Sequence, residues 1–176
     1  MPSETPSQKP FDIHTLLEDN HWELPSDLDL LDEIAEHIEK RLTIMGWNEA
    51  DLNKVSLVFS EAFTNAVVHG NAGLRREENE SNDIYRRRAA QVARTQDKKV
   101  VIETHFASDA FKFSIRDEGP GFDHTKLPDA LDPKNLLKSS GRGVFLIRRL
   151  AQKVEFNERG NKITVTIQRN PKTQNL

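Results

Sequence analysis

The amino-acid sequence predicts an α+β fold: a two-layer α/β sandwich in which helices cover one face of a mostly antiparallel, mixed sheet. Two segments, 111–116 and 162–168, alternate between apolar and polar residues, which is typical of strands with one buried and one solvated face. Two earlier segments, 28–42 and 49–68, repeat apolar residues at helical spacing. A doubly wound fold would need strands that are apolar on both faces and alternate with helices, and the sequence contains none.

The N-terminal part predicts a tail, a first strand and the first of these helices. Residues 1–18 are expected to form a flexible tail, because their first ten (MPSETPSQKP) hold three prolines and no periodic apolar pattern. Residues 21–24 (HWEL) are interpreted as a strand. Ser26 or Asp27 then caps the first helix, and Gly46 ends it.

Residues 72–99 have a different composition from the rest of the chain. They hold eight Lys or Arg and five Asp or Glu, with only scattered apolar positions. This composition predicts an exposed, charged insertion, of which residues 84–93 can form a helix. Two interpretations stay open: a solvated loop, or a helix that forms when its arginines bind an acidic partner surface.

The C-terminal half completes the order strand, helix, helix, strand, strand, helix, strand, strand. A polar loop with several Asp and Pro residues, 123–133, precedes the last helix. The remaining expected elements are strands at 100–106 and 111–116, a helix at 141–151, and strands at 154–156 and 162–168.

Composition excludes several classes of protein. The net charge is −3, the pI is near 6.1 and neither half is strongly basic, which argues against direct binding of nucleic acid. The chain has no cysteine, so disulfides, thiol nucleophiles and cysteine zinc sites are excluded. No apolar stretch is long enough for a membrane span and no signal sequence is recognisable, so a cytoplasmic protein without membrane association is expected.

The first candidate site motif is SEAFTNAVVHGN, at residues 60–71. Glu61, Asn65 and His69 follow each other at i, i+4 and i+8, so they form a polar stripe beside the apolar face of a helix. A carboxylate can polarise a hydroxyl or a water, and an amide oxygen can bind Mg²⁺. The alternative is a solvated stripe on an amphipathic helix.

The second motif, DEGPGF, directly follows an expected strand. Asp117 can accept a hydrogen bond from an exocyclic amine such as that of adenine, and Gly119 and Gly121 allow the backbone to approach a ligand closely. The alternative is an ordinary turn at the end of a strand.

The third motif, SSGRGVFLI, runs from a loop into a helix. The free N–H groups at the start of that helix, around Gly141, Arg142 and Gly143, are suited to bind phosphate. The alternative is a helix start that is merely capped by serine. The motif is not a P-loop, because it lacks the GK[ST] sequence.

In this order the three motifs resemble the N, G1 and G2 boxes of the GHKL ATPase superfamily, which has the Bergerat, or histidine-kinase-like ATPase, fold. The chain is most similar to the anti-sigma-factor serine/threonine kinases, with their patterns E-A-x-x-N-A-x-x-H-G, D-x-G-x-G and G-R-G-x-x-L-I. The resemblance covers roughly residues 20–168, and implies an ATPase domain over 19–170 that contains the insertion.

The resemblance also implies roles for individual residues, with ATP and Mg²⁺ as cofactors. Glu61 matches the catalytic base, Asn65 the Mg²⁺ ligand and Asp117 the residue that recognises adenine. The remaining matches are Gly119 and Gly121 below the nucleotide, Gly141, Arg142 and Gly143 at the phosphates, and His69 at the edge of the cleft.

The function implied by the resemblance is that of an ATP–Mg²⁺-dependent serine/threonine protein kinase that acts as an anti-sigma factor in a partner-switching system. Its partners would be a sigma factor and an anti-sigma-factor antagonist, the protein that it phosphorylates, and the resemblance allows a homodimer. The alternative is a non-catalytic ATP/ADP-sensing module that sequesters a regulatory protein.

The chain departs from the family pattern at two places. The connection after the first motif is usually short, whereas this chain carries the 72–99 insertion, and we expect a linker in place of 74–97 to leave ATP affinity nearly unchanged. The second departure is Arg159-Gly160-Asn161-Lys162, where many relatives have Gly-Thr before the last strand.

Overall fold

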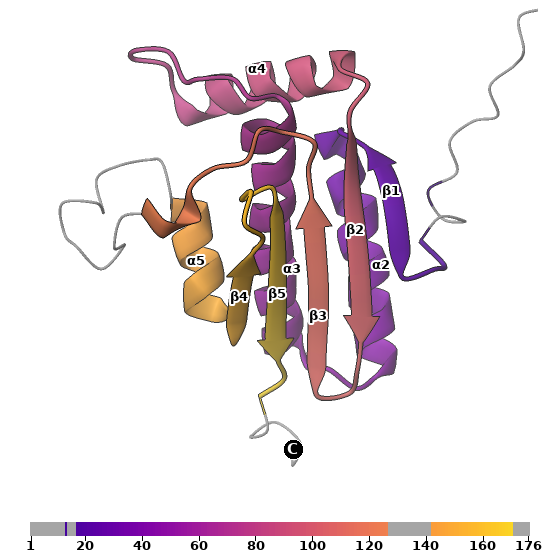
Figure 1. The fold of residues 1–176 in the computed structure, drawn as a ribbon. Coiled ribbons are helices and arrows are strands. Elements are labelled where there is room, and N and C mark those ends of the chain that lie inside the picture. Colours follow the sequence, from indigo (N-terminus) through magenta and orange to yellow (C-terminus); the bar gives the residue numbers. More distant parts are fainter. Residues whose placement is uncertain (1–12, 14–16, 127–141, 171–176) are drawn as a thin grey trace, which may run out of the picture.

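A computed structural model describes residues 13, 17–126 and 142–170, and its fold is the predicted α+β sandwich. Five strands form one sheet in the order β1-β2-β3-β5-β4, and every neighbouring pair is antiparallel. Helices cover one face of this sheet (Figure 1). The strands are β1 (His21–Pro25), β2 (Lys99–Phe106), β3 (Ala110–Arg116), β4 (Lys153–Phe156) and β5 (Lys162–Gln168), and the α-helices are α2 (Leu31–Ile44), α3 (Glu49–Thr64), α4 (Asn82–Thr95) and α5 (Arg142–Leu150).

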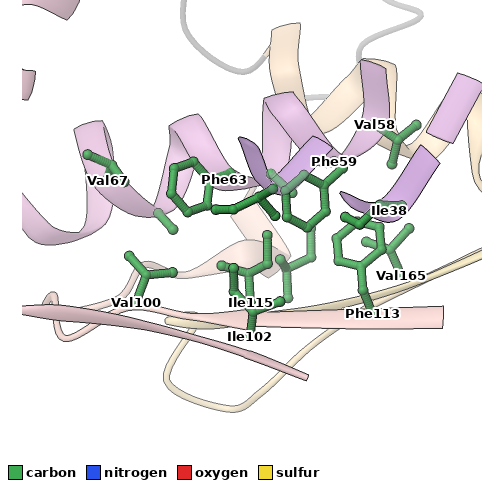
Figure 2. Packing of buried hydrophobic residues seen from close by; sticks show 14 of the residues in the cluster. Ile38, Val58, Phe59, Phe63, Val67, Val100, Ile102, Phe113, Ile115 and Val165 are labelled. Atoms are coloured by element: carbon green, nitrogen blue, oxygen red, sulfur yellow. The ribbon is translucent and has the colours of Figure 1, made fainter. Parts of the chain in front are cut away.

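The core lies between the helices α2 and α3 and the apolar face of the sheet (Figure 2). Phe59 of α3 packs edge-on against Phe113 of β3, with ring centroids 5.2 Å apart. Phe113 lies opposite Val165 of β5, and Ile115 opposite Ile163, so the alternating residues of both strands share this face. Alternation therefore identified the strands and the face that they bury.

The other face of the sheet is polar. Glu103 of β2 accepts hydrogen bonds from Ser114 of β3, at 2.8 Å, and from Lys162 of β5, at 2.6 Å. Lys162 is the main cause that lowers the pKa of the Glu103 carboxyl, and Ser114 contributes. In the described part of the chain, no helix is both long and apolar enough to cross a membrane.

Two residues of the predicted N-terminal tail belong to the core. Ile13 and Leu17 are both buried, and the Leu17 N–H donates to the Ile13 carbonyl at 3.0 Å. The tail prediction for 1–18 therefore does not hold at these two positions; residues 1–12 and 14–16 lie outside the described residues.

The helix predicted for 49–68 is longer and changes its winding at the first motif. Beyond Thr64 it continues as a π-helix, η2 (Asn65–Asn71), and the Ala72 N–H donates to the Val67 carbonyl five residues earlier, at 2.9 Å. A π turn holds more residues than an α turn, and such segments are frequent at functional sites. Helical spacing alone did not predict this change.

The expectation of a solvated loop at 72–99 is wrong, because a helix there packs on the domain. Helix α4 begins after Ser81, whose Oγ accepts a hydrogen bond from the Ile84 N–H. Tyr85, Ala89 and Ala93 recur at i, i+4 and i+8 and are buried. The helix expected at 84–93 is thus confirmed, and Figure 1 shows it crossing the end of η2.

Asn71, the last residue of η2, connects this helix to the sheet. Its side chain is fully buried, and its Nδ2 donates to Ser26 Oγ at 3.0 Å and to the Lys99 carbonyl at 2.9 Å. Its Oδ1 accepts from the Glu118 N–H at 2.7 Å, in the loop after β3. One amide thus fixes the end of η2 to the end of β1, the start of β2 and that loop.

Replacing this amide is expected to destabilise the whole domain. Asn71→Ala leaves the polar groups that it paired without partners, so we expect a loss of about 2–3 kcal/mol in the free energy of unfolding. Urea denaturation measures this loss, with Asn53→Ala as the control because Asn53 is exposed on α3. Equal stability of the two variants would contradict the role given to Asn71.

Candidate functional site

A cavity of about 580 Å³ opens where the end of α3, η2, the loop after β3, the start of α5 and α4 meet. Its volume lies within the range of roughly 300–1,000 Å³ that is typical of small-molecule sites. Residues from all three sequence motifs line it. The predicted site residues among them are Glu61, Asn65, His69, Asp117, Gly121 and Gly143.

The other predicted site residues lie beside the cavity or outside the described chain. Gly119 lies directly against Gly70 of η2. Arg142 is the first residue of α5. Gly141 is outside the described residues, as is most of the loop expected at 123–133.

The start of α5 lies against the polar stripe that runs from the end of α3 into η2. A Cβ on Gly143 would come within 2.7 Å of Glu61 Oε2 and 3.2 Å of Asn65 Nδ2, so only glycine fits there without displacing those side chains. The glycine therefore brings the backbone of the first α5 turn next to a carboxylate and an amide. Peptide N–H groups in a first helical turn have no partner within the helix and are suited to phosphate oxygens.

Asp117 lies against the end of η2. A Cβ on Gly70 would lie 2.3 Å from Asp117 Cγ, and one on Gly119 would lie 2.3 Å from the Gly70 carbonyl oxygen, so both glycines permit this close approach. Asp117 Oδ1 accepts a hydrogen bond from the Gly119 N–H at 2.8 Å. Burial raises the pKa of the Asp117 carboxyl, and this hydrogen bond offsets part of the rise.

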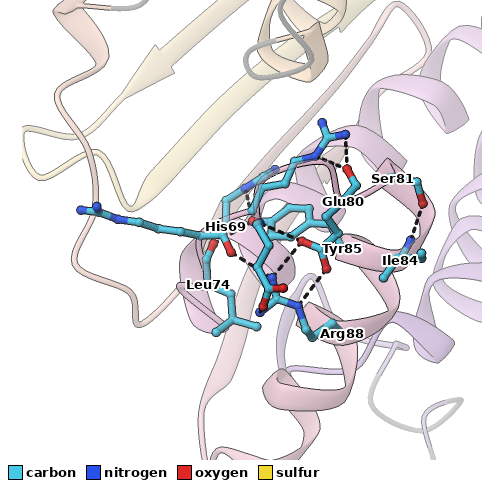
Figure 3. Close-up of polar contacts among 10 residues, drawn as sticks. His69, Leu74, Glu80, Ser81, Ile84, Tyr85 and Arg88 are labelled. Carbon is cyan, nitrogen blue, oxygen red and sulfur yellow. Dashed lines mark hydrogen bonds and ion pairs between the residues drawn. The ribbon is translucent and has the colours of Figure 1, made fainter.

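His69 lines the cavity, and Figure 3 shows it beside Tyr85 of α4. The Tyr85 hydroxyl donates its single proton to the Leu74 carbonyl at 2.9 Å, so at the 3.2 Å contact with His69 the phenol oxygen accepts from Nδ1–H. Burial, and to a smaller extent the charge of Arg86, lowers the pKa of His69. A neutral imidazole that carries its proton on Nδ1 keeps Nε2 as a hydrogen-bond acceptor.

A comparison with protein families finds that the model of the histidine kinase-like ATPase domain matches residues 24–167. The chain belongs to this family. The match supports the predicted resemblance to the GHKL-type ATPases and makes the pocket that of an ATP-binding domain. A comparison with curated proteins found no match.

Within the ATPase domain, Asn161 is a pocket residue that the sequence prediction did not identify. It is buried, its Nδ2 donates to the Asp117 carbonyl at 3.0 Å, and its own carbonyl accepts from the Asp117 N–H at 3.0 Å. It thus holds Asp117 in place from the turn before β5. The sequence held one indication of this role: Asn161 lies in the segment 159–162, where the chain departs from the Gly-Thr pattern of many relatives.

Helix α4 and the loop before it also contribute residues to the pocket of the ATPase domain. Their charged composition predicts an exposed insertion, either a solvated loop or a helix that binds an acidic partner, so none of these residues is predicted as a site residue. The pocket residues from this segment are Arg76, Asn82, Tyr85 and Arg86. The expectation that residues 74–97 are dispensable for ATP binding is therefore not supported by the structure.

The residues next to the start of α5 fit a Mg²⁺ ion bound with a nucleotide. Among the described residues, no cluster of three or more His, Cys, Asp or Glu side chains could hold a metal ion. Mg²⁺ does not need such a cluster, because it commonly takes one or two protein oxygens and completes its shell with phosphates and water. Asn65 and Glu61 are oxygen donors of this kind, and both border the pocket.

The predicted role of Asp117 can be tested with Asp117→Asn. The asparagine oxygen can still accept from Gly119, but its NH₂ group would meet the adenine amine as donor against donor, so we expect ATP affinity to fall more than tenfold. The pKa of Asp117 is raised in the folded state, so above that pKa the ionised carboxylate lowers the free energy of unfolding. Asp117→Asn removes this charge, and the variant should therefore be at least as stable as wild type at neutral pH. Calorimetry and urea denaturation measure the two effects; unchanged ATP affinity would exclude Asp117 from adenine recognition.

Proposed function

We propose that this ATPase domain is an ATP–Mg²⁺-dependent serine/threonine protein kinase that acts as an anti-sigma factor in a partner-switching system. In this proposal it binds a sigma factor and phosphorylates an anti-sigma-factor antagonist on serine. The family match supports the ATP-binding part of the proposal, and the E-A-x-x-N-A-x-x-H-G and G-R-G-x-x-L-I patterns support the kinase part. The homodimer that the resemblance allows remains a prediction.

The observation that carries the proposal is the contact between the Glu61 carboxylate and the start of α5. Gly143 leaves Glu61 Oε2 only 2.7 Å from the position where a Cβ would stand. A carboxylate at this place repels phosphate oxygens, so it weakens a site whose only task is to bind nucleotide. A general base that activates a substrate hydroxyl, in contrast, must lie beside the phosphates, because it has to reach the proton of the attacking group.

The roles of the side chains follow from this arrangement. Glu61 orients the substrate serine hydroxyl and accepts its proton as the serine oxygen bonds to the transferred phosphoryl group. Asn65 offers its amide oxygen to Mg²⁺, which when bound neutralises part of the phosphate charge. The backbone N–H groups near Gly143 hold phosphate oxygens in position for in-line transfer.

The kinase proposal is tested by phosphate transfer from radiolabelled ATP to a candidate antagonist, chosen among small proteins encoded beside this gene. Glu61→Gln keeps the size of the side chain and removes the base, so we expect transfer to slow by about 10²- to 10⁴-fold. ATP affinity should stay within roughly threefold or rise, because a like charge near the phosphates is removed. Glu49→Gln is the matched control, since Glu49 is exposed in the first turn of the same helix.

The outcome also separates the proposal from a nucleotide-sensing module. Full transfer in Glu61→Gln would remove that residue from the mechanism. If wild-type protein binds ATP and ADP and captures the sigma factor, yet labels no antagonist, the kinase proposal fails in favour of a non-catalytic sensor.

A further inference from the structure

Helix α4 belongs to the charged insertion, yet it forms one wall of the ATP pocket. We propose that Arg86 of this helix binds the phosphate chain of the nucleotide. This inference rests on the proposed function only in so far as that function requires ATP in this pocket. It adds a cationic contact that comes from the insertion and from none of the three sequence motifs.

Helix α4 is held firmly enough to position a side chain. Tyr85, Ala89 and Ala93 bury one face of it, and the Tyr85 hydroxyl is anchored on the Leu74 carbonyl. Near its other end, Arg94 Nε donates to Asp27 Oδ1 at 2.8 Å. The helix is therefore fixed both to η2 and to the segment after β1, and residues on its pocket side keep a defined position.

The arginines of α4 differ in what they contact. Arg88 makes two hydrogen bonds of 2.9 Å to the Glu80 carboxylate (Figure 3), and Arg94 pairs with Asp27. Arg86 is exposed, lines the pocket and, among the described residues, has no carboxylate partner. Arg87, its neighbour, is exposed as well but is not among the residues that line the pocket.

The surroundings of Arg86 leave its charge available to an anion. Lys98 and Arg159 are the cations that most lower the pKa of the Asp117 carboxyl, which burial raises. The charge of Arg86 acts on His69, one turn after Asn65 on the same helix, and lowers the pKa of this histidine. A guanidinium that has no ion pair within the described part of the chain, on the wall of a pocket that takes a polyphosphate, is suited to a charge-assisted contact with phosphate oxygens.

The inference is tested by measuring the affinity of the full chain for ATP, ADP, AMP and adenosine by calorimetry. Arg86→Ala should weaken ATP and ADP binding by roughly tenfold or more, because charge-assisted hydrogen bonds are about twice as strong as neutral ones. Adenosine, which has no phosphate, should bind within about twofold of wild type, since Arg86 contacts none of it. Arg87→Ala is the matched control and should leave all four affinities unchanged.

Two further variants test how the charge and the hydrogen-bond donors of Arg86 each contribute to ATP affinity. Arg86→Lys keeps the charge and loses the paired donors, so it should recover part of the ATP affinity; Arg86→Glu should weaken ATP more than Arg86→Ala does. Both changes are at an exposed residue, and circular dichroism checks that each variant is folded.

Some results would overturn the inference. If Arg86→Ala behaves like Arg87→Ala, the residue does not contact the nucleotide. If adenosine loses as much affinity as ATP, Arg86 recognises the ribose or the base and the phosphate assignment is wrong. Binding is measured without phosphate transfer, so a protein that binds ATP through Arg86 but labels no substrate contradicts the kinase proposal alone.

Discussion

The ATP pocket depends on the contact between the end of η2 and the loop that follows β3. Gly70 and Gly119 have no side chains, and this lets the two segments approach until Asp117 lies against the helix backbone. The buried amide of Asn71 holds the same junction through the Glu118 N–H and the Lys99 carbonyl. Without this junction, the first and second motifs would not border one cavity.

The other walls of the pocket are built on this junction. From the sheet side, Asn161 fixes the backbone of Asp117 through two hydrogen bonds. On the helix side, the π winding of η2 precedes α4, and Tyr85 of α4 returns to contact His69. Gly143 then admits the start of α5 beside Glu61. The site thus combines polar groups from helices with a strand end, and the apolar core between α3 and the sheet keeps them in register.

Local sequence patterns predicted most of the fold and part of the site. The features that they did not predict depend on tertiary contacts. Alternation identified β3 and β5, and the spacing of Glu61 of α3 and Asn65 of η2 placed both side chains at the pocket. The packing of α4 was missed because its buried stripe consists of Tyr85 and two small alanines among many charges. The position of Arg86 at the pocket could not be predicted, since it follows from how α4 crosses η2, which no local pattern records.

The central claim is that η2, the loop after β3 and the start of α4 form one ATP site, and hydrogen–deuterium exchange of the full chain tests it most directly. With saturating ATP and Mg²⁺, amide exchange should slow together in residues 65–71, 117–121 and 82–86, because a bound ligand stabilises the segments that contact it. Exchange in β1 and α2, which do not line the pocket, should change little. Protection of η2 and the loop after β3 without any at 82–86 would contradict the place of α4 in the site, and protection of none of the three would contradict the site itself.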